Sequence, residues 1–289
     1  MKTNLFIAGA CKSGTSFLHE FLGQQNDICE SIPKEPYFFE LPKENRDESA
    51  YFKKYFNHYN SEKYLVDGRH RTMFFSWIPQ AIYDYNKHSR IIFILRDPIN
   101  RAYSHWWMWY ARNIIKTKFH GTIKNELKRI SKTGLQMDLT PEAYAMHIKN
   151  EAPLGRMAYA DSSTILESGY YYKQICRFKK LFNDTQLLII DYEEILNTET
   201  LSIKLSKFLG VDVFPVAKNQ VVNKAPEFAK SKLGVGKFLP IKLKNYIKNK
   251  LFRKQKIEEK SKKMLAAHYR EENHKLYEEF GLDFVKNWF

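Results

Sequence analysis

The stretch from Leu5 to Leu22, LFIAGACKSGTSFLHEFL, limits the folds open to this chain more than any other. A short apolar run leads into a loop that contains glycine, and the loop opens directly into a segment with apolar residues on one side: Phe17, Leu18, Phe21 and Leu22. A strand, a phosphate-binding loop and a helix have this layout. The sequence therefore predicts an α/β fold built around an anion site.

The loop departs from that of nucleoside triphosphatases at one position. Gly9 and Gly14 have the spacing of the G-x-x-x-x-G-K-[ST] motif, but Thr15 stands where the lysine belongs. The loop's lysine, Lys12, comes two residues before the second glycine. A P-loop kinase would also need a later acidic residue for Mg²⁺. Thr15 therefore counts against a small-molecule kinase, which we keep as an alternative.

Apolar runs alternate with helical patterns along most of the chain. We expect strands at residues 4–8, 63–67, 90–96 and 185–191, and helices at residues 15–24, 98–113, 168–182 and 201–209. This alternation predicts a P-loop-type three-layer fold, in which helices flank a central parallel β-sheet and ligands bind at the carboxyl ends of the strands. We interpret residues 1–289 as a single domain with an insertion at about 114–163 that covers the acceptor.

Composition is typical of a soluble globular protein. Hydrophobic residues make up 44% of the 289 residues, which is enough for a large core. No apolar run approaches the roughly 18–20 residues that cross a bilayer, and no leader precedes the first strand. We therefore expect no transmembrane segment and a cytoplasmic location. The three cysteines suit neither a disulfide framework nor a zinc site, so we expect reduced thiols and no metal.

The formal net charge of +15 is concentrated near the C-terminus. Residues 230–263 hold 13 Lys or Arg against 2 acidic residues, and Leu243, Ile247 and Leu251 recur at helical spacing. We predict a basic helical segment that attracts an acidic acceptor, a membrane surface or only solvent. A nucleic-acid-binding module is a further alternative, but no recognised motif accompanies the charge, so we expect no nucleic-acid partner.

A second anion site is indicated by RIIFILRDPINRAYSHWW, residues 90–107. A buried strand ends at Arg96, Asp97 is placed to cap a helix, and Pro98 suits the first helical turn. Arg96 and Ser104 can then hold one dianion with a guanidinium fork and a hydroxyl. A buried ion pair between Arg96 and Asp97 is the structural alternative.

A third segment, IPKEPYFFE at residues 32–40, presents a carboxylate in a stiff loop. Lys34 and Glu35 lie between Pro33 and Pro36, whose rings restrict the backbone. Such a loop suits a carboxylate that points into a cleft. An exposed loop with an incidental Lys–Glu pair explains the same residues.

Together the three segments resemble the sulfotransferases that use 3′-phosphoadenosine 5′-phosphosulfate (PAPS), particularly the glycan-modifying branch with the heparan sulfate enzymes and many bacterial relatives. Lys12-Ser13-Gly14-Thr15 matches the family's K-x-G-T loop, which binds the 5′-phosphosulfate. Arg96-Asp97-Pro98 with Ser104 matches the motif that binds the 3′-phosphate, and Lys34–Phe39 matches K-E-x-x-F-F. The resemblance covers most of the chain.

The acceptor side departs from the heparan-type pattern. Ser16 stands where an arginine is frequent, and Tyr37 where a histidine is frequent. In VDGRHRTMFF, residues 66–75, Arg69 or Arg71 can take the place of a family lysine. The identity of the acceptor and the oligomeric state therefore stay open.

The resemblance implies transfer of a sulfuryl group from PAPS to a hydroxyl or amine, with a carbohydrate acceptor favoured, adenosine 3′,5′-bisphosphate as product and no metal. Lys12 would stabilise charge on the leaving phosphate. The backbone of residues Ser13, Gly14, Thr15 and Ser16 would hold the 5′-phosphate at the positive end of the helix. Glu35 is the implied base. A histidine serves as the base in the steroid and phenol branch, which leaves His58, His70 and His105 as alternatives.

Overall fold

The computed structural model describes residues 2–151, 163–215 and 254–289. Five parallel strands form one sheet in the order β2-β3-β1-β4-β5. The strands are β1 (Leu5–Gly9), β2 (Ile28–Glu30), β3 (Tyr64–Gly68), β4 (Arg90–Leu95) and β5 (Leu187–Asp191). The chain first builds the sheet to one side of β1 and then to the other. The loops that follow β1 and β4 consequently lie next to each other at the carboxyl edge, where α/β sheets bind ligands.

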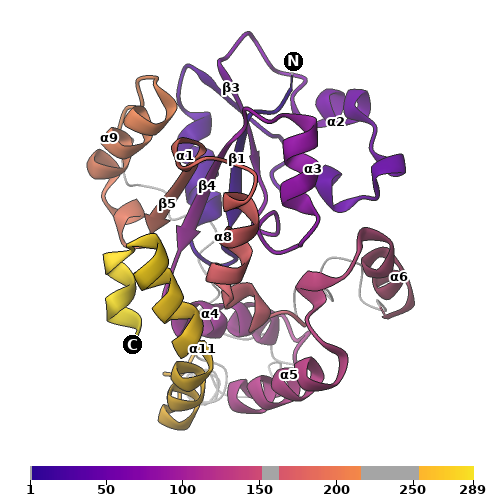
Figure 1. The fold of residues 1–289 in the computed structure, drawn as a ribbon, viewed down its shortest axis with the longest axis vertical. Helices are drawn as coiled ribbons and strands as arrows, with labels where there is room; N and C mark the ends of the chain where they lie inside the picture. The colour runs from indigo at the N-terminus through magenta and orange to yellow at the C-terminus, as the bar shows by residue number, and fades with distance from the viewer. Residues whose placement is uncertain (1, 152–162, 216–253) are drawn as a thin grey trace, which may run out of the picture.

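Helices cover both faces of the sheet (Figure 1). On one face lie α1 (Thr15–Gly23) and α9 (Thr198–Leu209), and on the other α2 (Glu48–Tyr55), α3 (Ile78–Tyr85) and α8 (Tyr171–Lys179). Both faces of the sheet are apolar because successive side chains of a strand point to opposite faces. In β1, Leu5 and Ile7 pack on the side of α1, whereas Phe6 and Ala8 pack on the side of α8. The predicted three-layer fold is confirmed.

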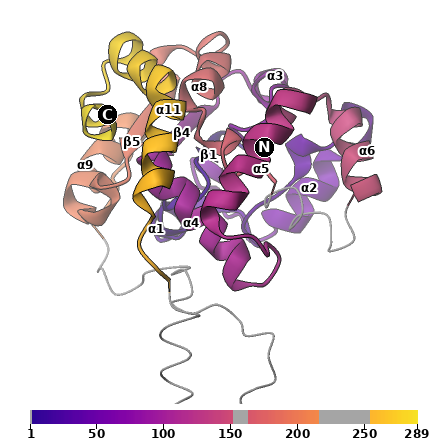
Figure 2. The ribbon, with the colours of Figure 1, turned by 90° about the horizontal axis from the view of Figure 1, so that it is seen from below.

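A further group of helices lies beyond the carboxyl ends of the strands (Figures 1 and 2). It includes α4 (Pro98–Ala111), α5 (Phe119–Thr133), α6 (Pro141–Glu151) and α11 (Glu259–Phe280). Helices α4, α5 and α11 share an apolar cluster that contains Trp106, Trp107 and Tyr269. Short 3₁₀ helices complete the described elements: Phe38–Glu40, Lys43–Asn45, Gln136–Asp138, Glu167–Gly169, Asp184–Gln186, Glu194–Leu196 and Asp283–Trp288.

The structure adds elements that the sequence patterns did not predict. Strand β2 has three residues, too few for a periodic signal, and α2, α3, α5, α6 and α11 were not predicted. The helix expected at 168–182 is narrower, because a 3₁₀ turn precedes α8. The predicted insertion at 114–163 is largely helical where it is described, and Arg71 donates from its Nη2 to Tyr144 Oη of α6 at 2.6 Å.

The basic segment falls mostly outside the described residues. The predicted stripe of Leu243, Ile247 and Leu251 lies there, whereas residues 259–263 open α11. No helix in the described part of the chain is both long and apolar enough to cross a membrane.

A buried acidic cluster joins α5 to the segment before α8. Glu126 is 6% exposed, and its Oε1 accepts a hydrogen bond from Leu166 N at 2.8 Å. Glu167 is fully buried, accepts from Met137 N at 3.1 Å and pairs with Arg129. Burial, reinforced by the nearby charge of Glu167, raises the pKa of Glu126 to about 8. The folded protein therefore favours the protonated form of this carboxyl.

This raised pKa predicts a loss of stability as the pH rises from about 4.5 to about 8. The stabilising contribution of protonated Glu126 is complete below the ordinary value of 4.5 and is lost as the pH rises through about 8. Glu126→Gln should flatten the decline in the free energy of unfolding between pH 5 and pH 8, measured by urea denaturation. Glu142→Gln, at an exposed position on α6, is the control and should keep the parental slope. A parental slope in Glu126→Gln would contradict the assignment.

Candidate active site

The loop between β1 and α1 is shaped to bind an anion with its backbone. Gly14 has a φ of +90°, and a Cβ at this position would lie 2.2 Å from Ile195 Cδ1, so glycine is required. Gly14 is the N-cap of α1, and as a glycine it has no side chain with which to cap the helix. Because no side chain of Gly14 caps the first turn, its N–H groups, including those of Thr15 and Ser16, can point to a ligand. Ser13 differs, because its N–H donates to Ala10 O at 3.1 Å and closes the loop itself.

Lys12 and Arg96 come from the two neighbouring loops and lie together. The backbone of Lys12 is left-handed, with a φ of 65°, and its Nζ lies 3.7 Å from Met108 Sδ of α4. Arg96 follows β4, and its Nη1 donates to Lys12 O at 3.1 Å. The guanidinium also lies 4.4 Å from the centre of the Tyr192 ring. The two predicted anion sites therefore form one continuous cationic region.

Helix α4 begins as the sequence predicts. Asp97 Oδ1 accepts from Ile99 N at 2.9 Å, so this carboxylate caps the helix rather than forming an ion pair with Arg96 among the described residues. Ser104 lies farther along α4 and is 7% exposed. Between them Arg101 is fully buried and donates to Ile165 O. Ser104 is thus held on a helix whose start is fixed beside Arg96.

Lys254, a cation that the sequence analysis did not single out, joins Lys12 and Arg96. Its Nζ lies 5.2 Å from the centre of the Tyr103 ring of α4. Burial lowers the pKa of Lys254, and the charges of Arg96 and Lys12 lower it further. Cations that repel one another at close range favour the binding of an anion. In the sequence, Lys254 is one of 13 basic residues in the segment 230–263, so no pattern distinguished it.

Glu35 lies on the loop between β2 and α2 with a left-handed φ of 70°. Its Oε1 contacts Lys34 Nζ and His70 Nδ1, each at 3.0 Å, and Arg69 Nη1 donates to its backbone oxygen at 3.2 Å. Burial alone would raise the pKa of Glu35, but the charges and hydrogen bonds of His70 and Lys34 hold that pKa well below its usual range. No described residue is hydrogen-bonded to Oε2. Glu35 is thus an ionised carboxylate with one oxygen left for a ligand.

The three histidines considered as bases occupy different surroundings. His70 contacts Glu35, as described above. His58 Nε2 lies 3.4 Å from Cys29 Sγ, beside β2. His105 is fully buried on α4, where its Nδ1 lies 3.4 Å from Arg101 Nη1. The structure therefore brings His70, among these three, to the predicted catalytic carboxylate.

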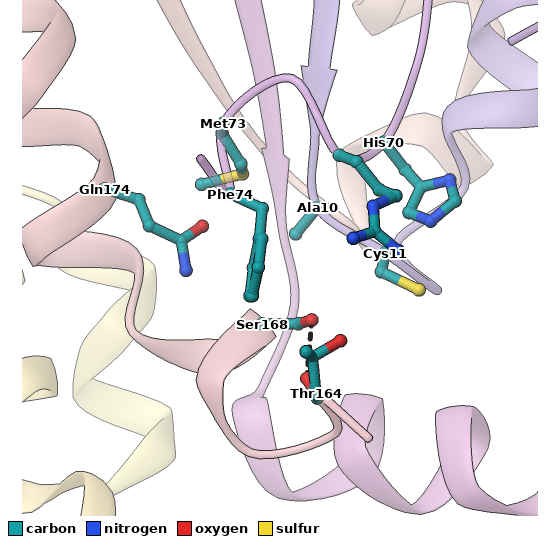
Figure 3. A pocket seen from close by; sticks show the side chains of 9 residues that line it. Ala10, Cys11, His70, Met73, Phe74, Thr164, Ser168 and Gln174 are labelled. Atoms are coloured by element: carbon teal, nitrogen blue, oxygen red, sulfur yellow. Dashed lines mark hydrogen bonds between the residues drawn. The ribbon is translucent and has the colours of Figure 1, made fainter. Parts of the chain in front are cut away.

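A pocket lies beside the pair formed by Glu35 and His70 (Figure 3). It is bounded by the loops after β1 and β3 and by the segment before α8. Its lining consists of Ala10, Cys11, His70, Arg71, Met73, Phe74, Thr164, Ser168 and Gln174. Of the two arginines that could face the acceptor, Arg69 is buried and its Nε pairs with Glu40 Oε1 at 2.5 Å. Arg71 also contacts Glu40, but it lines the pocket. Arg71 is therefore the better placed of the two to contact an acceptor.

Comparison with known proteins identifies the family. The family described as "Sulfotransferase domain" matches residues 2–281, which is nearly the whole chain. The chain belongs to the sulfotransferase family. The resemblance drawn from the three motifs is confirmed, and with it the prediction that this protein is a sulfotransferase.

Two relatives show how far the likeness extends. The sulfotransferase is 27% identical over 233 residues to the bifunctional heparan sulfate N-deacetylase/N-sulfotransferase 1 of Xenopus laevis. That match covers 72% of this chain but 22% of the relative, so the chain spans less than a quarter of the relative's length. The crystal structure of a sulfotransferase from Alicyclobacillus acidocaldarius superimposes with a TM-score of 0.67 at 21% identity, covering 96% of this chain and 95% of that chain. The two proteins share a fold.

The position of Lys254 predicts a contribution to anion binding. Lys254→Ala should raise the dissociation constant for adenosine 3′,5′-bisphosphate by roughly 10-fold or more, because a charge-assisted contact is lost. Lys256→Ala, two residues away at an exposed position, is the matched control and should bind normally. Isothermal titration calorimetry at fixed ionic strength measures both. Equal affinities for the two variants would remove Lys254 from the site.

Proposed function

We propose that this sulfotransferase transfers a sulfuryl group from PAPS to a hydroxyl or amine, with a carbohydrate as acceptor. The observation that carries the proposal is the convergence of Lys12, Arg96 and Lys254 beside the first turn of α1. PAPS has two separate anionic groups, and this arrangement offers a helix start for one and an arginine with a helix-borne hydroxyl for the other. The residues present therefore fit the donor.

Each part of the cationic region has a proposed task. The N–H groups of Gly14, Thr15 and Ser16 hold the 5′-phosphate, and Ser13 keeps the loop closed through its bond to Ala10. The side chains of Lys12, Arg96 and Ser104 take the remaining two tasks. Arg96 and Ser104 bind the 3′-phosphate, while the charge of Lys12 stabilises the oxygen that the sulfuryl group leaves. The donor supplies the sulfuryl group, and the nucleophile belongs to the acceptor.

Glu35 is the proposed base. His70 Nδ1 and Lys34 Nζ both contact Oε1, so Oε2 can accept the proton of the attacking hydroxyl or amine. The lowered pKa keeps Glu35 ionised, but it also makes the carboxylate a weak base. Proton transfer is therefore helped when Lys34 moves away from Oε1 or when His70 is neutral, because either change raises the basicity of Glu35.

His70 is the second candidate for the base, and the 3.0 Å contact with Glu35 favours it over His58 and His105. If neutral His70 donates from Nδ1 to Glu35, its Nε2 becomes the proton acceptor, and the carboxylate serves to orient the ring. His70 lines the pocket, so this alternative has the geometry it needs. The two assignments differ in their dependence on pH.

The nature of the acceptor is supported by the relative from Xenopus laevis, whose name specifies heparan sulfate and N-sulfotransfer. A labelled sulfuryl-transfer assay against glycan amines, glycan hydroxyls, lipids and small alcohols, read by mass spectrometry, tests the proposal. A thermal-shift screen supplements it with adenosine 3′,5′-bisphosphate, ATP with Mg²⁺ and an oligonucleotide. Stabilisation by the bisphosphate alone is expected, because a ligand that binds the folded state raises its melting temperature. Stabilisation by ATP or the oligonucleotide alone would favour the kinase or nucleic-acid alternative.

Removing the charge of Lys12 should impair chemistry more than binding. Lys12→Met keeps most of the side-chain length and the left-handed backbone, so it isolates the ammonium group. Turnover should fall roughly 10²- to 10³-fold, because a charge that stabilises the transition state is lost. Bisphosphate affinity, measured by calorimetry on the same sample, should fall much less. Near-normal turnover in a folded Lys12→Met protein would contradict the assigned role.

Two substitutions distinguish the candidate bases. Glu35→Gln should retain donor affinity and lower turnover by roughly 10²-fold or more, whereas His70→Asn, which keeps a donor near the position of Nδ1, should retain substantial activity. With Glu35 as the base, the acid side of the turnover profile should stay flat between pH 5.5 and pH 8, because the lowered pKa keeps the carboxylate ionised. Loss of all activity in His70→Asn, with a parental acid limb near neutral pH, would instead assign the base to His70.

A further inference from the structure

We propose that Cys11 is a modification site, at which the thiolate reacts with peroxides and thereby inactivates the phosphosulfate loop. The reactivity of Cys11 stands on the geometry around the thiol, whereas its effect on donor binding rests on the proposed function.

The first observation is the place of Cys11 in the fold. It directly precedes Lys12 in the loop after β1 and is 5% exposed. Its side chain and that of His70 lie together on the wall of the pocket (Figure 3). The proposal requires a small neutral molecule such as hydrogen peroxide to approach Sγ through this pocket, because the residue is otherwise largely buried.

The second observation concerns His105, which approaches Cys11 from α4. Arg101 Nη1 lies 3.4 Å from His105 Nδ1, and since a guanidinium can only donate, Nδ1 must accept. Neutral His105 consequently carries its proton on Nε2. That atom is buried and makes no hydrogen bond within the described residues, and the Cys11 thiol is a group with which His105 interacts. His105 is thus positioned to donate a hydrogen bond to a thiolate.

The charges around Sγ favour the same ionised form. Burial alone would raise the pKa of Cys11, but its interactions with His105 and His70 lower it to about 5. Two further groups near the thiol are also basic: Arg101 from α4 and Arg71 from the loop after β3.

The other two cysteines have the opposite environment. Burial raises the pKa of Cys29 to about 12, and the charges of Glu62 and Glu30 contribute to this rise. Burial likewise raises the pKa of Cys176. Because only a thiolate attacks a peroxide rapidly, Cys29 and Cys176 serve as internal controls within the same protein.

The reaction is a two-electron oxidation. The Cys11 thiolate attacks one oxygen of hydrogen peroxide, an S–O bond forms, and the O–O bond breaks. Hydroxide leaves and takes up a proton to give water, so sulfur is oxidised and the peroxide is reduced. The sulfenic acid adds an oxygen atom between His70 and His105. We expect it to displace His70 from Glu35 and to shift the loop at Lys12, which impairs both donor binding and turnover.

The test uses the whole purified protein and hydrogen peroxide in slight excess, with dimedone to trap sulfenic acid and peptide mass spectrometry to locate it. Cys11 should be labelled first, and adenosine 3′,5′-bisphosphate should slow its labelling. Iodoacetamide gives a second measure. Cys11 should react almost as fast at pH 6 as at pH 8, whereas an ordinary thiol with a pKa of about 8.5 would slow by roughly 75-fold.

Oxidised protein should lose most of the melting-temperature rise that the bisphosphate gives, and dithiothreitol should restore it. Cys176→Ser is the matched control and should remain sensitive to peroxide, whereas Cys11→Ser should give the same shift before and after treatment. Labelling of Cys29 or Cys176 as fast as Cys11 would overturn the site. Complete oxidation of Cys11 with an unchanged bisphosphate shift would overturn its inactivating effect. If the untreated protein shows no bisphosphate shift, the proposed function fails, while the labelling rates still decide whether Cys11 is reactive.

Discussion

The site depends on one constraint, which is that β1 and β4 are neighbours in the sheet although β2 and β3 separate them in the chain. This neighbourhood places the loop after β1 against the loop after β4, where Arg96 Nη1 donates to Lys12 O. The hydrogen bond neutralises no charge, because it uses the backbone of Lys12. The loops that carry the two cations are therefore held together by a contact that leaves the charge of the Arg96 guanidinium uncompensated.

A concentration of positive charge in the absence of its ligand costs stability, and the surroundings of these cations limit that cost. Arg96 lies over the Tyr192 ring, and Lys254 over the Tyr103 ring, so each cation has an aromatic face as a partial counterpart. The carboxylate of Glu35 is instead engaged by Lys34 and His70. In the proposed mechanism, these contacts let one edge of the sheet hold an anionic donor and an ionised carboxylate together.

The helices beyond the sheet edge connect the two sides of the site. Helix α4 carries Ser104 and His105 and begins at the cap Asp97, so a local cap fixes the direction of both residues. Tyr144 of α6 contacts Arg71, which ties the predicted insertion to the loop after β3. The pocket is thus built from segments far apart in the chain.

Local sequence determined the features that depend on neighbouring residues. The apolar run, Gly14 and the amphipathic helix give the first loop its shape, and Asp97 with Pro98 starts α4. Contacts across the sheet were decided by the tertiary structure alone. Glu35 pairs with His70, which lies 35 positions away in the sequence. His105 interacts with Cys11 across 94 positions, and Lys254 interacts with Lys12 across 242 positions. Spacing and periodicity report which face a residue occupies in its own element, but side-chain charge and basicity depend on burial and on partners that folding brings together.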